Sequence, residues 1–126
     1  MKRFWIALAV LAVISAWCFV SAALIGSHTD AMLKDLEEVR QAADRADYAA
    51  ARTAADRAER HWTNCEDLLG ALLRHDEADQ VMSALAELRE YAAVGDRDDL
   101  LAVCATTIRQ LQHIREMELP LIRNVL

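Results

Sequence analysis

Hydrophobic and polar positions divide the chain into one uniformly apolar segment and several periodic segments. Phe4 to Ile25 is a run of 22 residues without a charged side chain. As a helix this run would extend about 33 Å, against roughly 30 Å for the hydrocarbon core of a bilayer. After Gly26, apolar residues recur at alternating steps of three and four, which is the spacing of one face of an α-helix. The pattern predicts a membrane-spanning helix followed by amphipathic helices.

Four amphipathic runs follow Gly26. The first extends from Met32 to Ala46, and the second is the longest, with apolar positions at Tyr48, Ala51, Ala55, Ala58, Trp62, Cys65, Leu69 and Leu72. The third, from Ala78 to Ala92, is out of phase with the second, so we expect a turn or slip near His75. The fourth begins at Leu101 and is expected to end near Glu118, because proline disfavours helical geometry in the residue before it.

An internal repeat at an offset of 49 residues supports this division. Leu36-Glu37-Glu38-Val39-Arg40 resembles Leu85-Ala86-Glu87-Leu88-Arg89, and Asp47 falls on Asp96. In each copy a small residue, Ala46 or Gly95, can end one helix, and the aspartate after it can N-cap the next. The repeat predicts two tandem helical hairpins, at about residues 29–74 and 77–118, with a C-terminal tail at 119–126. Duplication and convergence would both explain it.

Composition agrees with an all-α protein, because three glycines and one proline leave little material for the turns of a β-fold. We predict a cytoplasmic stub and transmembrane signal-anchor at residues 1–26, followed by an extracytoplasmic four-helix bundle of two tandem hairpins at residues 27–126. Asp76 would N-cap the third helix of this bundle. The alternative is one long helix from Asp47 to Val94, kinked near His75, with the outer helices packed on its halves.

Charge sets the expected topology. Lys2 and Arg3 precede the apolar run, whereas Asp30 and Asp35 follow it, so the N-terminus is expected in the cytoplasm. The alternative is a secretory signal cleaved after Ala22. The chain beyond Gly26 has a net charge of −8, which argues against nucleic-acid binding because phosphate backbones are repelled.

Few residues have the pattern of a chemical site. His75, Asp76, Glu77 and Asp79 could begin a metal site, but we interpret them as the caps and dipole-matching acids of a helix end. No metal or cofactor is therefore predicted. Beyond the apolar run the chain has only two serines and no glycine-rich turn. Little is therefore available for nucleophilic catalysis or an oxyanion hole, which argues against an enzyme.

The large or reactive apolar positions are interpreted as core residues. Trp62 is expected to be the principal core anchor. In the predicted hairpins Cys65 and Cys104 lie at heights that differ by about 15 Å, which is too far for a disulfide. We expect both cysteines to be small core residues. Gly70 would mark close helix approach or a soft point in the second helix.

The basic start, the single span, Trp62, the His75-Asp76-Glu77 run and the terminal Ile122-Arg123-Asn124-Val125-Leu126 resemble a family of small membrane-anchored helical proteins of Gram-positive bacteria. It is the domain-of-unknown-function family four-three-six-three. The chain departs from that family in being rich in Arg and Ala rather than Lys and Glu. The resemblance implies no activity, because none is assigned to the family.

The sequence thus predicts a membrane-tethered structural or protein-interaction module on the outer side of the cytoplasmic membrane. Its partners would be the lipid bilayer, through residues 4–25, and an envelope protein or a second copy of the chain. One alternative is an extracytoplasmic ligand-sensing bundle that works with a separate transmembrane partner. Another is a weak metal-binding domain using His75, Asp76, Glu77 and Asp79.

Overall fold

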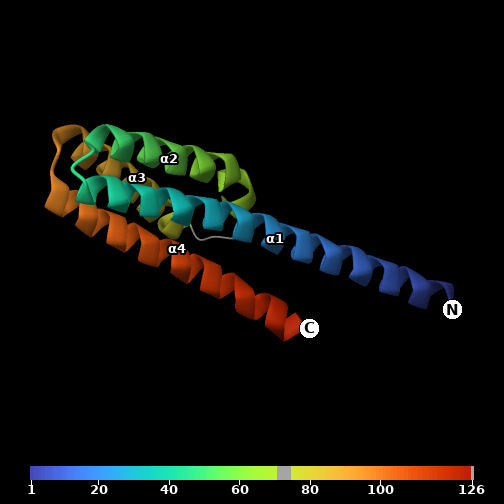
Figure 1. Cartoon of the computed structure of the whole chain (residues 1–126). Helices are drawn as coiled ribbons and strands as arrows, with labels where there is room; N and C mark the ends of the chain where they lie inside the picture. The colour runs from blue at the N-terminus through green and yellow to red at the C-terminus, as the bar shows by residue number, and fades with distance from the viewer. Residues whose placement is uncertain (71–74, 126) are drawn as a thin grey trace.

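The computed structural model describes the backbone at residues 1–70 and 75–125, and the side chains at 1–24, 26–66 and 75–116. The described residues form four helices and no strand: α1 (Lys2–Asp44), α2 (Tyr48–Gly70), α3 (His75–Val94) and α4 (Arg97–Val125) (Figure 1). The expected all-α class is therefore confirmed.

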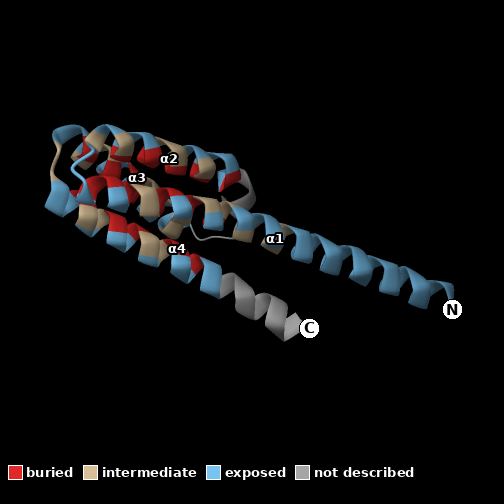
Figure 2. Cartoon of the chain, viewed as in Figure 1, coloured by how far each residue is buried: buried red, intermediate tan, exposed pale blue. Residues whose placement is uncertain are grey.

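Helix α1 joins two segments that the sequence separates. It runs unbroken for 43 residues through the apolar run and the first amphipathic run. The sequence predicts a membrane helix followed by a separate first packed helix, and the structure instead joins the two runs in one helix. One glycine inside a helix costs only about 1 kcal/mol, which the neighbouring turns can offset. Burial begins at Thr29 and Met32, and the part of α1 before Ser21 is exposed throughout (Figure 2).

The helices pack in a ring in which α1 contacts α2 and α4, and α3 contacts α2 and α4. We call Thr29–Asp44 of α1 together with α2, α3 and α4 the packed region. Arg89 of α3 forms ion pairs with Asp56 and Glu59 of α2, both at 2.7 Å. Because α2 and α3 lie side by side, the alternative of a single helix from Asp47 to Val94 is wrong.

Helix α4 extends farther than the sequence indicates. It runs from Arg97 to Val125, so the expected end near Glu118 is wrong. Pro120 lacks a backbone N–H and therefore removes one helical hydrogen bond, but proline can also be accommodated within a helix, most often with a kink. The helix accordingly includes most of the segment expected to be a tail.

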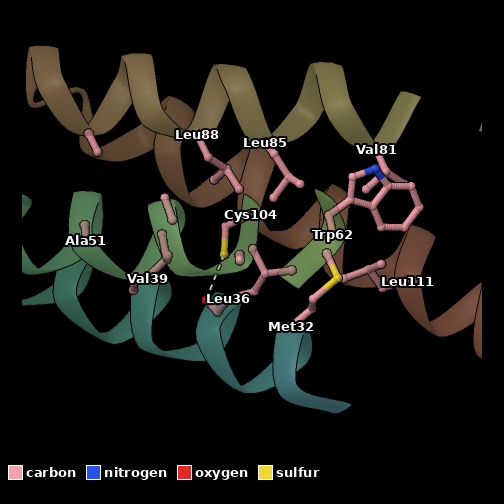
Figure 3. Close-up of a cluster of buried hydrophobic side chains, with 14 of the residues drawn as sticks. Met32, Leu36, Val39, Ala51, Trp62, Val81, Leu85, Leu88, Cys104 and Leu111 are labelled. Carbon is pink, nitrogen blue, oxygen red and sulfur yellow. Dashed lines mark hydrogen bonds between the residues drawn. The ribbon is translucent and has the colours of Figure 1, made fainter. Parts of the chain in front are cut away.

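One hydrophobic core fills the packed region. Its largest fully buried side chains include Trp62, Met32, Leu36, Leu85 and Leu111. Figure 3 shows the ring of Trp62 beside Val81, with Met32 and Leu111 close to it. Helix α2 contributes mainly alanines to this core: Ala51, Ala54, Ala55 and Ala58. These small side chains let α2 approach its neighbours closely, and Trp62 supplies the bulk at its far end.

The internal repeat is also a repeat of burial. Besides Asp35 and Ala84, residues 49 apart are buried together at nine positions. The pairs are Met32 and Val81, Leu36 and Leu85, Val39 and Leu88, Ala43 and Ala92, Ala51 and Leu100, Ala55 and Cys104, Ala58 and Thr107, Trp62 and Leu111, and Cys65 and Ile114. The α1–α2 and α3–α4 pairs therefore use the same positions to build the core.

The two repeats also share their turns. Ala46 and Gly95 each follow a helix with a positive φ, of 55° and 79°. The next amide, of Asp47 or Asp96, donates to the carbonyl five residues earlier, at 2.8 and 3.1 Å. The carboxylates of Asp47 and Asp96 then accept hydrogen bonds from Ala50 N–H and Asp99 N–H, both at 3.2 Å. These contacts end one helix and start the next.

Replacing the residue with positive φ should affect the stability of the protein differently in the two turns. Gly95→Ala is expected to destabilise the protein by about 1 kcal/mol, because alanine disfavours positive φ. A Cβ at Gly95 would lie 3.5 Å from the Tyr48 ring, which is ordinary van der Waals contact, so the expected cost comes from the backbone. Ala46→Gly, at the matched position, should leave stability unchanged or raise it. Urea unfolding of both variants checks this, and a stabilising Gly95→Ala would contradict the assigned backbone strain.

The thiols of Cys65 and Cys104 are free and buried, as expected for core residues. Cys104 Sγ donates to the carbonyl of Leu36 at 3.1 Å, and Cys65 Sγ donates to that of Trp62 at 3.4 Å. Burial raises the pKa of both thiols, that of Cys104 to about 11. The reactive thiolate is therefore scarce near neutral pH.

Alkylation should show this burial directly. At pH 8, below the raised pKa of Cys104, iodoacetamide is expected to leave Cys65 and Cys104 unmodified in the folded protein. Both should react fully once the chain is denatured. Peptide mass spectrometry before and after denaturation measures the difference. Rapid modification of Cys104 in the folded state would mean that the α1–α4 contact opens readily.

Candidate functional site

The residues singled out by the sequence as a possible metal site do not assemble into one. His75, Asp76 and Asp79 are exposed, and Glu77 is half-buried. Helix α3 begins at His75, so Asp76 lies inside its first turn beside Glu77, and the expected N-cap at Asp76 is wrong; negative charge in this turn interacts favourably with the helix dipole. Among the described residues, no group of three or more His, Cys, Asp or Glu side chains is placed to hold a metal ion.

A different polar cluster lies between α1 and α2. It consists of Asp35 and Glu38 on α1 with Arg57 and His61 on α2 and is called here the α1–α2 cluster. The Asp35 carboxylate lies 2.7 Å from His61 Nδ1 and 3.8 Å from Arg57 Nε. Arg57 Nη2 donates a hydrogen bond to Glu38. Two helix faces are thus joined by four ionisable side chains.

Asp35 is the unusual member of this cluster. Its side chain is 7% exposed, whereas those of His61, Arg57 and Glu38 are 37%, 41% and 41% exposed. A buried carboxylate is costly unless it is paired. Asp35 lies against Nδ1, on one edge of the His61 imidazole, and the second ring nitrogen is Nε2. That nitrogen accepts a hydrogen bond when the imidazole is neutral and donates one when it is protonated.

The repeat supplies an internal control for this cluster. The position equivalent to Asp35 is Ala84, which is also buried, and the position equivalent to His61 is Gln110. Arg57 corresponds to Thr106. The second hairpin therefore forms the same packing without an ionic cluster. Because the second hairpin packs in the same way with Ala84, Thr106 and Gln110 at these positions, the charges of the first hairpin are the best candidates for a functional contact.

A shallow groove adjoins the α1–α2 cluster. It has a volume of about 370 Å³ and shares Glu38 and Arg57 with the cluster. Its remaining lining residues are Gln41, Ala42, Arg45, Ala50 and Thr53. The alanines create the hollow, and the rim offers guanidinium, amide, hydroxyl and carboxylate groups. Such a mixed surface can hydrogen-bond a polar partner segment.

The α1–α2 cluster was not predicted from the sequence. The signal available was the repeat, because Asp35 falls on Ala84 beside the core position Leu36. A charged residue at a position that is apolar in the other copy marks a departure from the packing pattern. Its partner could not be read from the sequence, since His61 is 26 residues away on another helix.

The other sequence-predicted residues serve the fold. Trp62 is 1% exposed, and its indole N–H has no hydrogen-bond partner among the described residues. Asp47, Gly95 and Asp96 form the turns described above. Near the second turn, the charges of Asp96 and Asp98 raise the pKa of Asp99, with Asp96 the larger cause. Gly70 is the last residue of α2, and its surroundings lie outside the described side chains.

Comparison with known proteins gives one relation. The family model described as a domain of unknown function (DUF4363) matches residues 19–125. No curated protein and no solved structure matches the chain. The match covers the end of the apolar run and all the packed helices.

Proposed function

Because the chain belongs to the DUF4363 family, whose description assigns no activity, we propose from the structure that it is a membrane-tethered interaction module. In this proposal the apolar part of α1 spans the membrane. The packed region is a four-helix bundle of two hairpins on the outer side, and it meets an envelope protein or a second copy of the chain.

One observation supports the proposal that α1 tethers the protein to a membrane. By length and composition, α1 is the one helix among the described residues that could cross a membrane, and none of its apolar window is buried. Its exposed large hydrophobic side chains extend from Phe4 to Leu24. Exposed apolar surface on this scale needs a covering, and a bilayer matches its length. A buried core helix of a soluble protein would instead be covered by its own chain.

The charge pattern favours one orientation. Lys2 and Arg3 precede the span, and Asp30 follows it. Positively charged flanks remain on the cytoplasmic side, so the packed region would face outward.

The α1–α2 cluster is the contact surface that we propose for the partner. It combines a carboxylate-backed imidazole, a guanidinium shared by two acids and the adjoining polar groove. The matched face of the second hairpin lacks Asp35, Arg57 and His61. A partner that recognises one hairpin and not the other would therefore distinguish them by these charges.

Fractionation of cells tests the tether. The full-length protein is expected to remain with the membrane after carbonate extraction, because the span is held by its apolar area. Protease added to intact cells should remove the packed region, since it lies outside. A cytoplasmic membrane protein serves as the control for cell integrity.

Two results would contradict this proposal. Release of the whole chain by carbonate would show that α1 does not span the bilayer. A soluble product that begins at Ala23 would show cleavage of the N-terminal segment and loss of the anchor.

A further inference from the structure

We propose that the groove beside the α1–α2 cluster receives the α3–α4 face of a second copy of the chain, so that copies pack side by side in the membrane. The α3–α4 face consists of the residues that lie 49 positions after the groove residues. The inference rests on the proposed contact surface and tether, and it names the partner. The repeat supports it, because equivalent positions of the two hairpins form surfaces of opposite shape and charge.

The two hairpins are related by a half-turn about the long axis of the packed region. The ring of helix contacts places the α1–α2 and α3–α4 faces on opposite sides, and residues 49 apart occupy equivalent core positions. A half-turn about this axis leaves height unchanged, so residues 49 apart lie at the same level. In the proposed tether every copy spans the membrane in one direction. Parallel neighbours can therefore meet with α2 against the neighbour's α3 and α1 against its α4.

The equivalent surfaces have opposite shapes. Ala42 lines the groove and is itself buried, whereas the equivalent residue of the second hairpin is Tyr91, which is half-buried. Arg45 at the groove corresponds to Val94, whose side chain is 81% exposed. The first hairpin is thus hollow at the level where the second carries a phenol ring and an exposed valine. Tyrosine is enriched in protein interfaces, and here it can fill the hollow of a neighbour.

The equivalent surfaces also differ in charge. Two arginines and one acid line the groove, namely Arg45, Arg57 and Glu38. The α3–α4 face has no lysine or arginine and carries three exposed acids, namely Glu87, Glu90 and Asp99. The charge of Asp99 is the largest cause that raises the pKa of Tyr91, followed by burial and by neighbouring acids. The phenol is therefore surrounded by negative charge, which favours a cationic surface opposite it.

One pair of opposite charges follows from the level of Arg57. This arginine on α2 meets Glu38 of α1 within the chain, so the two side chains lie at one height. The residue equivalent to Glu38 is Glu87 on α3. Since equivalent residues share a height and α2 faces the neighbour's α3, Arg57 of one copy is level with Glu87 of the next.

A second pair follows in the same way at the other helix of the groove. Arg45 on α1 lines the groove together with Ala50, and the residue equivalent to Ala50 is Asp99 on α4. Arg45 of one copy is therefore close in level to Asp99 on the neighbour's α4. The two faces in contact are different, so the contact is heterologous. Such a contact repeats from copy to copy and gives a row or a ring.

Disulfide cross-linking of the full chain in membranes tests this arrangement. Gln41→Cys lies at the groove on α1, and Ala102→Cys lies on α4 at the position equivalent to Thr53, which also lines the groove. Both positions are exposed, and neither substitution removes a charge. Cys18→Ser removes the exposed native thiol, while Cys65 and Cys104 are buried. The two variants carry different tags, are produced in the same cells, and are oxidised in the isolated membranes.

A disulfide between the two tagged chains is expected, whereas neither variant alone should form a linked dimer. A chain with both cysteines should form products longer than a dimer, because each copy then offers both halves of the contact. Linked dimers of Gln41→Cys alone would show that two α1–α2 faces meet, and the heterologous contact would be wrong.

Charge exchange tests the pairing at Arg45. Arg45→Glu in the Gln41→Cys chain should lower the yield of the mixed disulfide several-fold, and so should Asp99→Arg in the Ala102→Cys chain. Combining the two reversals should restore the yield, which a misfolded variant could not do. Arg52→Glu is the matched control, because Arg52 lies on the face of α2 with Asp56 and Glu59, which meet Arg89. A loss as large with Arg52→Glu would contradict the assigned contact.

Failure of this inference differs from failure of the proposed function. If no combination of variants forms a disulfide while carbonate leaves the chain in the membrane, a second copy does not occupy the groove and the tether stands. If carbonate releases the chain, the tether is wrong, and with it the reason for parallel neighbours.

Discussion

Replacing Trp62 with alanine is expected to lower the free energy of unfolding by about 3–5 kcal/mol. Trp62 is 1% exposed and is the largest fully buried side chain in the core. Its neighbours on α2 are mainly alanines, which cannot move to fill the space. A loss of this size is a large share of the stability of a small domain. Urea unfolding of the full chain in detergent micelles, followed by circular dichroism, measures it.

A matched variant separates volume from hydrogen bonding. Because the indole N–H has no partner among the described residues, Trp62→Phe removes part of the volume and no hydrogen bond. It should cost clearly less than Trp62→Ala. Leu111→Ala, at the equivalent position of the second repeat, should cost about 2–5 kcal/mol. A cost below about 1 kcal/mol for Trp62→Ala would show that the ring does not support the core.

The second prediction concerns the α1–α2 cluster, in which replacing His61 is expected to destabilise the protein more than replacing Asp35. His61→Ala should cost about 1–3 kcal/mol, because it leaves the buried Asp35 carboxylate without its 2.7 Å contact. Arg57 lies 3.8 Å from the same carboxylate and still partly neutralises it, so the loss of stability should lie near the lower end of this range. Asp35→Ala should be nearly neutral, since the second repeat packs Ala84 at the equivalent position.

A double-mutant cycle measures the coupling. With Asp35 already replaced by alanine, His61→Ala should cost little, because no buried carboxylate remains to be left without a partner. Urea unfolding of the single and double variants provides the four free energies. A large cost for Asp35→Ala alone would show that the carboxylate holds α1 to α2 and would remove the argument that the fold can dispense with it. In that case the cluster would be structural.

The fold class was predictable because its signals are local. The steps of three and four between Tyr48 and Cys65 require only the helical period. The Gly95-Asp96 turn was also readable, since glycine accepts positive φ and aspartate caps the following helix. The resemblance to the family was confirmed by the match over residues 19–125.

The helix boundaries were less predictable, because local preferences compete with the packing of the whole chain. Gly26 is a weak helix residue, yet α1 continues through it into the core positions Met32 and Leu36. Pro120 disfavours a helix, yet α4 continues to Val125. Each preference is worth about 1–3 kcal/mol, which adjoining helical turns and packing can exceed.

The candidate site depended on tertiary structure altogether. The chain by itself determined four amphipathic helical runs, two capped turns and an apolar run long enough to span a membrane, because each is a property of neighbouring residues. Only the folded arrangement decided that Asp35 meets His61 and that α1 runs unbroken from the apolar run into the packed region. Those features depend on how two helix faces come together, and helical periodicity indicates which face is buried without indicating which partner covers it.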